Sequence, residues 1–249
     1  MTRIIEGDTV GAPRCLALLR GLTSHDRAER DGCAVIADNW FGPGGFDFTE
    51  DVTVAWVLAW AAVREPPGGL ARAEMLDALQ GMAIEDRAPT AALELVVSTI
   101  HRSDVSPAEI DFYDDLVAAR SRPGPEGPPG GGGRPLGAER CLELVRGLAS
   151  TSAAERRAAA TAVAGRAAAG DLDAGESATI ATVLAWAVEV ETTRSRPVLL
   201  SALLVLAEGA RVPLRVLDRT VAHLAGARLD QVEEGFLTDL AAALRRAEG

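Results

Sequence analysis

A repeat of about half the chain's length constrains the fold more than any other feature of this sequence. The pentapeptide Val-Leu-Ala-Trp-Ala at 57–61 returns unchanged at 183–187, 126 positions later. Without a gap, residues 14–61 match residues 140–187 at 22 of 48 positions. The match then continues at a displacement of 124, because the second copy lacks two residues. We therefore interpret the chain as a tandem duplication, in which both halves solve the same folding problem.

Alanine and leucine supply most of the apolar surface of this 249-residue chain. Hydrophobic residues make up 48% of it but aromatic residues only 4%, a balance that is typical of helical proteins. In each half, the apolar residues recur at helical spacing, and no segment alternates convincingly as a strand does. The sequence therefore predicts an all-α fold with six helices in each half.

The predicted helices begin at capping residues or prolines and end near glycine or proline. In the first half we expect helices over 13–22, from 26, over 49–64, over 70–84, over 89–101 and from 106. The helix at 49–64 is apolar nearly all round, so we expect it to be buried at the centre of its half. Capping boxes are expected between Asp26 and Glu29, and between Ser106 and Glu109, with counterparts in the second half.

A segment rich in glycine and proline separates the two halves. Residues 121–137 contain five prolines and seven glycines. Such a composition cannot bury enough apolar surface to fold and is typical of an extended linker. The predicted organisation is a first helical-repeat domain at 1–120, the linker at 121–137 and a second helical-repeat domain at 138–249.

The charge of the chain argues against nucleic-acid binding. The net charge is −11 and all 25 basic residues are Arg, whereas a nucleic-acid binder needs a basic surface. The absence of Lys also excludes a P-loop lysine and a Schiff-base lysine. Acidic residues are concentrated in the first half: residues 14–120 contain 18 acidic residues and 9 Arg, whereas residues 138–249 contain 15 acidic residues and 13 Arg. Two interpretations stay open: a solubilising surface, or an acidic face for a basic partner.

No motif indicates catalysis, a metal site or a cofactor. The three His and three Cys have no neighbours at metal-ligand spacing. The first ten residues lack the apolar core of a signal peptide, and the longest apolar run, at 54–63, is ten residues long, about half of a membrane span. We expect a cytoplasmic protein that is not an enzyme and that has no cofactor and no membrane partner.

The segment 40–48 is the strongest departure from the repeat. It holds four of the chain's ten aromatic residues, whereas its counterpart at 166–174 holds none. Aromatic rings beside acidic residues are typical of an interface with a basic protein. The predicted protein-binding residues are Trp40, Phe41, Phe46, Asp47, Phe48, Glu50 and Asp51. The alternative, that the rings close the core of the first half, stays open.

Several stretches resemble HEAT-type repeats, which pair two antiparallel helices in each unit. The resemblance rests on residues 28–30, 154–160 and 72–79, which are similar to the Arg-x-x-Ala-x-x-Ala-Leu rhythm of the second HEAT helix. The Asp that usually precedes the Arg is not regularly placed here. The resemblance covers most of both halves and implies stacked helical hairpins. Small acidic bacterial proteins of HEAT-like type often act as immunity partners that bind and block a secreted toxin, and this chain is similar in size and charge.

The resemblance and the charge together imply a non-enzymatic protein-binding module. The expected function is that of an inhibitory or immunity-type partner, which binds another protein through its acidic first half. A scaffold or adaptor without an inhibitory role is the alternative. HEAT-like folds also support DNA glycosylases, but that function needs a positively charged groove, which the net charge of −11 disfavours.

Overall fold

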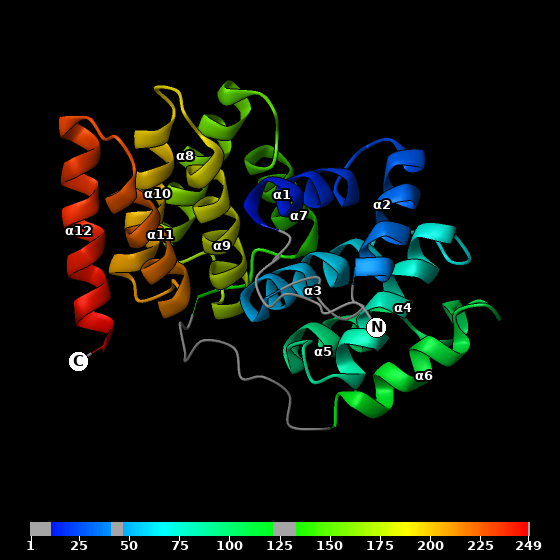
Figure 1. Cartoon of the computed structure of the whole chain (residues 1–249). Coiled ribbons are helices and arrows are strands. Elements are labelled where there is room, and N and C mark those ends of the chain that lie inside the picture. Colours follow the sequence, from blue (N-terminus) through cyan, green and yellow to red (C-terminus); the bar gives the residue numbers. More distant parts are fainter. Residues whose placement is uncertain (1–10, 41–46, 122–132, 249) are drawn as a thin grey trace, which may run out of the picture. The chain divides into compact units, whose positions relative to one another are not determined.

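The computed structural model of this chain describes residues 11–40, 47–121 and 133–248. These residues form twelve α-helices and one short 3-10 helix, and no strand occurs among them. The all-α fold predicted from the sequence is confirmed. The chain divides into two compact units, Met1–Gly127 and Pro128–Gly249. In Figure 1 the helices of the first unit run from blue to green and those of the second from green to red.

The first unit is a stack of three helical hairpins in two layers. Its helices are α1 (Gly11–Leu22), α2 (Arg27–Trp40), α3 (Phe48–Ala62), α4 (Leu70–Ile84), α5 (Thr90–Thr99), the 3-10 helix η1 (Arg102–Asp104) and α6 (Ile110–Ala119). Chain neighbours pair as α1–α2, α3–α4 and α5–α6. Helices α1, α3 and α5 pack in succession as one layer, and α2, α4 and α6 form the other. Such packing is typical of helical repeats.

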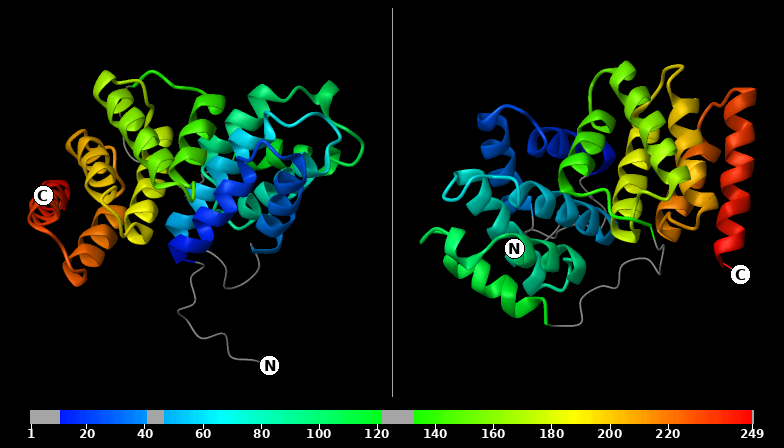
Figure 2. Two further views of the ribbon diagram at one scale, coloured as in Figure 1. Left: turned by 90° about the horizontal axis from the view of Figure 1, so that it is seen from above. Right: turned by 180° about the vertical axis from the view of Figure 1, so that it is seen from behind.

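The second unit has the same order of helices and the same two layers (Figure 2). Its helices are α7 (Ala138–Leu148), α8 (Ala153–Ala169), α9 (Ala174–Val190), α10 (Arg196–Glu208), α11 (Leu214–Gly226) and α12 (Gln231–Glu248). Helices α7, α9 and α11 form one layer, and α8, α10 and α12 form the other. Shifted back by 126 or 124 positions, its helices begin within three residues of those in the first unit.

The third helix is the central one in each unit. Residues 53–62 of α3 and residues 176–188 of α9 are buried on all sides. The largest side chains in these runs, Trp60 and Trp186, are each 1% exposed. A helix without a polar face has to be covered all round, because apolar surface left in water costs free energy. The prediction of a buried central helix at 49–64 is therefore confirmed, with bounds of Phe48–Ala62.

The first two helices of each unit approach closely at a glycine. A Cβ atom at Gly21 would lie 2.0 Å from Sγ of Cys33, and one at Gly147 would lie 2.7 Å from Cβ of Ala159. Both distances are far shorter than a van der Waals contact, so a side chain at either glycine would push the two helices apart. This contact explains the glycine that both halves have near the end of the first helix.

Helix α2 begins with a serine relay instead of the predicted capping box. The N–H of Asp26 donates to Oγ of Ser24 at 3.1 Å, and that hydroxyl donates to the carboxylate of Glu29 at 2.6 Å. Helix α8 has the same relay at Ser152, Ser150 and Glu155. The predicted box needs the carboxylate to accept directly from the capping residue, but the serine two positions earlier lies between them. The predicted helix start is confirmed. The predicted box is not formed at Asp26, and it is half formed in the second unit, where Oγ of Ser152 accepts from the N–H of Glu155 at 3.4 Å.

The end of the predicted linker belongs to the second unit. Of the segment 121–137, residues 133–137 lie within the described part of the chain. Their backbone N–H groups donate to the carbonyl of Gly170 at 3.0 Å and to the carboxylate of Glu176 at 2.8 and 2.9 Å. Residues 122–132 lie outside the described residues.

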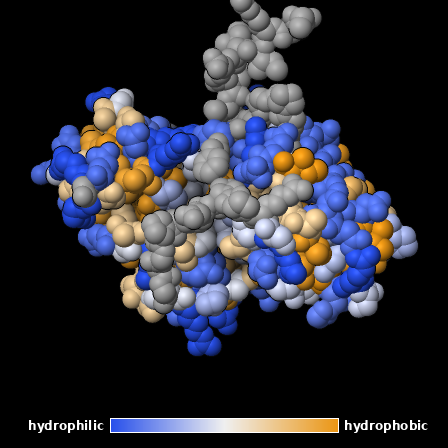
Figure 3. Space-filling model, turned by 90° about the horizontal axis from the view of Figure 1, so that it is seen from below, coloured by the Kyte–Doolittle hydropathy of each residue, from blue (hydrophilic) through white to orange (hydrophobic). Residues whose placement is uncertain are grey.

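The surface carries small apolar areas. On the face in Figure 3, hydrophobic residues gather in separate areas among hydrophilic ones. The large apolar side chains that are exposed in the described residues are Ile36, Leu70, Ile84, Ile110, Leu214 and Val232. Within the same residues, no helix has both the length and the apolar character that a bilayer span requires.

Candidate functional site: an acidic surface of the first unit

A buried arginine–glutamate pair joins the first and second hairpins of each unit. In the first unit Arg30 binds Glu65, and in the second Nε of Arg156 donates to Glu191 at 2.9 Å. Each arginine also donates to the carbonyl of the serine six positions earlier, at 3.0 and 2.6 Å. Burial opposes ionisation of Glu191, but hydrogen bonds from Thr193 and Arg156 outweigh it and lower its pKa. Glu191 therefore carries its charge in the folded state.

A second pair joins the second and third hairpins. Nε of Arg72 lies 3.3 Å from Glu109, and Nε and Nη2 of Arg196 donate to Glu233 at 2.6 and 2.7 Å. Each arginine also donates to the carbonyl five residues before its glutamate, at 3.0 and 3.4 Å. The hydrogen bond from Arg196 lowers the pKa of Glu233. Both units have these two arginine–glutamate pairs. We call the two pairs of a unit its arginine frame.

The glutamates of this second pair also accept hydrogen bonds from backbone N–H groups just before the last helix of each unit, α6 or α12. Glu233 accepts from the N–H of Asp230 at 3.1 Å, and Asp230 accepts from the N–H of Glu233 at 2.9 Å, so the predicted capping box is confirmed there. Glu109 accepts from the N–H of Ser106 at 2.8 Å. However, Oγ of Ser106 has no hydrogen-bond partner and α6 begins only at Ile110. The predicted box at Ser106 is therefore half formed.

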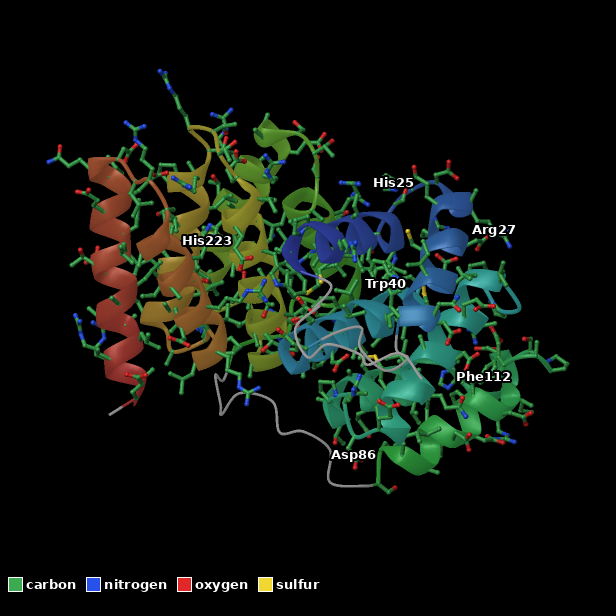
Figure 4. All side chains as sticks on the ribbon, viewed as in Figure 1. His25, Arg27, Trp40, Asp86, Phe112 and His223 are labelled. Carbon is green, nitrogen blue, oxygen red and sulfur yellow. The ribbon has the colours of Figure 1, made fainter. Side chains whose placement is uncertain are left out.

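The structure describes only part of the predicted aromatic segment. Trp40 is the last residue of α2 and is half-buried (Figure 4). Phe41 and Phe46 lie outside the described residues, and so does the side chain of Phe48. The binding of a partner through these rings stays a prediction.

The acidic residues beside that segment are built into the start of α3. Asp47 accepts from two N–H groups of the first turn, both at 2.8 Å, and Glu50 accepts from the N–H of Asp47 at 3.1 Å. The second unit has the same box at Asp173 and Glu176. Glu50 is 0% exposed and Asp51 is 2% exposed. Because these two carboxylates are buried, they do not present the surface charge that we expected from the sequence.

Asp51 is a buried acid, and nearby positive charge offsets little of the free-energy cost of burying its carboxylate. Its carboxylate lies 3.6 Å from the guanidinium of Arg87. Burial raises the pKa of Asp51 to about 7, and the attraction of Arg87 offsets this only in part. The second unit has Ser177 at the corresponding position. The fold of a unit therefore does not need a carboxylate there.

A cluster of half-buried acids lies on the packed helices α2 and α4. Asp38 of α2 and Glu74 and Asp77 of α4 are each half-buried. Burial raises the pKa of Glu74 and of Asp77, and the charge of Asp38 raises both further. Within the described residues, no arginine forms an ion pair with any of the three. We call these three residues the acidic patch.

The acidic patch is confined to the first unit. The residues at the corresponding positions of the second unit are Ala164, Val198 and Ser201. The second unit forms its arginine frame without these charges, so the fold does not require them. On α4 the patch lies in one stripe between the exposed side chains of Leu70 and Ile84, which are 51% and 61% exposed. Exposed apolar side chains on the same helix face as charges without an ion-pair partner are suited to contact with another protein.

No protein family, curated protein or solved structure matches this chain. Among the described residues, no group of three or more His, Cys, Asp or Glu is placed to hold a metal ion. The sequence pattern alone does not reveal the acidic patch, because Asp38 and Glu74 are far apart in the chain. A position-by-position comparison of the two halves would have found it.

Proposed function

We propose that this protein is a non-enzymatic protein-binding module, and that the acidic patch of the first unit binds a basic partner. The observation that carries the proposal is the confinement of Asp38, Glu74 and Asp77 to one unit of two that have the same frame. Like charges held close together repel each other and cost stability. Arginine or lysine side chains of a partner would remove that repulsion on binding, which favours the complex.

The partner that fits this surface best is a basic protein whose own active surface is covered on binding. This corresponds to the inhibitory, immunity-type role that the sequence resemblance implies. The 18 acidic residues against 9 Arg at 14–120 would also steer such a partner toward the first unit. A scaffold role without inhibition remains the second candidate, and cytoplasmic location stays a prediction.

We also propose that the two units are duplicated copies of a six-helix HEAT-like unit. The matching arginine frames support this origin. So does the backbone at Asp86 and Ala210, which are 124 positions apart and both left-handed, with φ of 56° and 53°. Non-glycine residues adopt this conformation rarely, so its occurrence at corresponding positions also supports the proposal.

The proposal is tested with a variant that removes the charges and keeps the shapes of the side chains. Partners are captured with the wild-type chain, and the affinity of each purified partner is measured by calorimetry. The patch variant carries Asp38→Asn, Glu74→Gln and Asp77→Asn. The control variant removes three exposed carboxylates of the second unit, with the substitutions Glu208→Gln, Asp218→Asn and Asp239→Asn. Both variants have the same net charge.

We expect the patch variant to bind at least about tenfold more weakly, a change of about 1.4 kcal/mol, and with a smaller dependence on salt. The control variant should bind like the wild type. Equal weakening in both variants would reduce the effect to net charge and would contradict a defined patch. If the partner is an enzyme, retained activity in the complex would favour the scaffold over the inhibitor.

A further inference from the structure

A cavity of the second unit has a charge distribution that its frame does not explain. It has a volume of about 380 Å³ and lies where the turn before α10 meets the turn before α12. Cavities that hold small ligands begin at about 300 Å³. The charged residues that line it are Arg194, Arg196, Arg228, Asp230 and Glu233.

Three of these five charged residues already bind one another. Arg196 donates two hydrogen bonds to Glu233. Asp230 accepts from the N–H groups of Val232 and Glu233, both at 2.9 Å, and so caps α12. These groups hold the wall of the cavity and have little capacity left for a ligand.

The other two, Arg194 and Arg228, are exposed and have no carboxylate partner within the described residues. The chain has 36 acidic residues and 25 arginines, so it is acidic as a whole. Two guanidinium groups without a carboxylate partner beside one cavity are the opposite of this overall charge. Only the backbone carbonyl of Arg228 takes part in the frame, as the acceptor for Arg196 at 3.4 Å. Its side chain does not contribute to that contact.

The first unit has the same frame without these two cations. There Arg72 binds Glu109 and donates to the carbonyl of Asp104, which stands where the second unit has Arg228. The segment between Glu65 and Arg72, at 66–71, contains no charged residue, whereas the shorter segment between Glu191 and Arg196 of the second unit contains Arg194. Both arginines are therefore additions to a frame that forms without them.

We propose that this cavity is a binding site for an oxyanion group of a small molecule, a phosphate or a carboxylate. The planar guanidinium group of arginine donates two parallel hydrogen bonds to either group. Two such groups at one cavity provide the charge and the donors, and the hydroxyl of Thr192 at its wall adds another donor. This site lies in the second unit and does not depend on the partner proposed for the first.

The test is a titration of the full chain followed by NMR. The isotope-labelled chain is titrated separately with inorganic phosphate and with citrate, at constant ionic strength, so that the two arms distinguish a phosphate site from a carboxylate site. The cavity variant carries Arg194→Gln and Arg228→Gln. The control variant carries Arg157→Gln, which removes an exposed arginine of α8 that does not line the cavity.

We expect saturable shifts of residues 192–197 and 228–233 with at least one of the two anions. The cavity variant should bind that anion at least about tenfold more weakly, about 1.4 kcal/mol, and the control should bind like the wild type. Circular dichroism verifies that both variants are folded. If the cavity variant is not folded, Arg194→Gln and Arg228→Gln are measured separately. The absence of saturable binding by either anion, or equal affinity in the cavity variant, would overturn the proposal. Neither result would bear on the acidic patch.

Discussion

The substitution Asp51→Asn should stabilise the first unit, by an amount that grows with pH. Asp51 is 2% exposed, and burial raises its pKa from 3.8 to about 7. Between these two values the folded state holds a proton that the unfolded state has released, so the stability of the wild type falls as pH rises through this window. The difference between these two pKa values corresponds to roughly 4 kcal/mol above pH 7. Asn has the same shape and no charge, so it avoids this cost.

The prediction is checked by urea unfolding of the wild type and the variant at pH 5 and at pH 8. Most of the range between the two pKa values lies between pH 5 and pH 7, so the advantage of Asn should increase by roughly 3 kcal/mol between the two conditions. Asp218→Asn on the exposed surface of α11 is the control and should show no such increase. An advantage that is the same at both pH values would refute the reasoning. So would a loss of stability at pH 8, because it would mean that Arg87 holds the carboxylate in its charged form.

Four further substitutions test the packing of the units. Trp60→Ala and Trp186→Ala should each destabilise their own unit by roughly 3–5 kcal/mol, because both rings are fully buried; partner binding lost at unchanged denaturant midpoint would speak against that role. Gly21→Ala should cost about 1–3 kcal/mol by overpacking, and adding Cys33→Ala should recover part of the loss, since the Sγ atom is the nearest obstacle. No recovery in the double variant would show that the backbone is the obstacle. Arg156→Ala should cost about 3–5 kcal/mol in urea unfolding, because it leaves Glu191 buried and unpaired; a cost below about 1 kcal/mol would place this pair with weak surface pairs.

Much of the fold could be predicted from the sequence because its signals are local and occur twice. The helix expected at 70–84 has the observed bounds Leu70–Ile84, since a Pro-Pro-Gly-Gly turn precedes it and its apolar residues have helical spacing. The central helix could be predicted because it lacks a polar face. The start of α2 could also be predicted, but its capping contacts could not, because the hydroxyl of Ser24 takes the place that Glu29 was expected to fill.

The candidate site was harder to predict because it depends on contacts between distant residues. Sequence alone showed that Glu50 and Asp51 are acidic, but not that they lie on the buried side of α3. The Asp-x-x-Glu pattern at Asp47 is a known sign of a capping box and would have indicated a structural role. The acidic patch combines residues of α2 and α4, and only the packing of the second helix of each hairpin brings them together.

The central claim is that the partner binds the acidic patch, and hydrogen–deuterium exchange tests it most directly. The exchange of the full chain is measured alone and in complex with the captured partner, with the control variant of the second unit measured in parallel. We predict that the partner slows the exchange of α2 and α4, at 27–40 and 70–84, in the wild-type chain. In the patch variant, the same partner concentration should leave the exchange of these helices as it is in the free chain. Protection confined to the second unit, or equal protection in the patch variant, would contradict it.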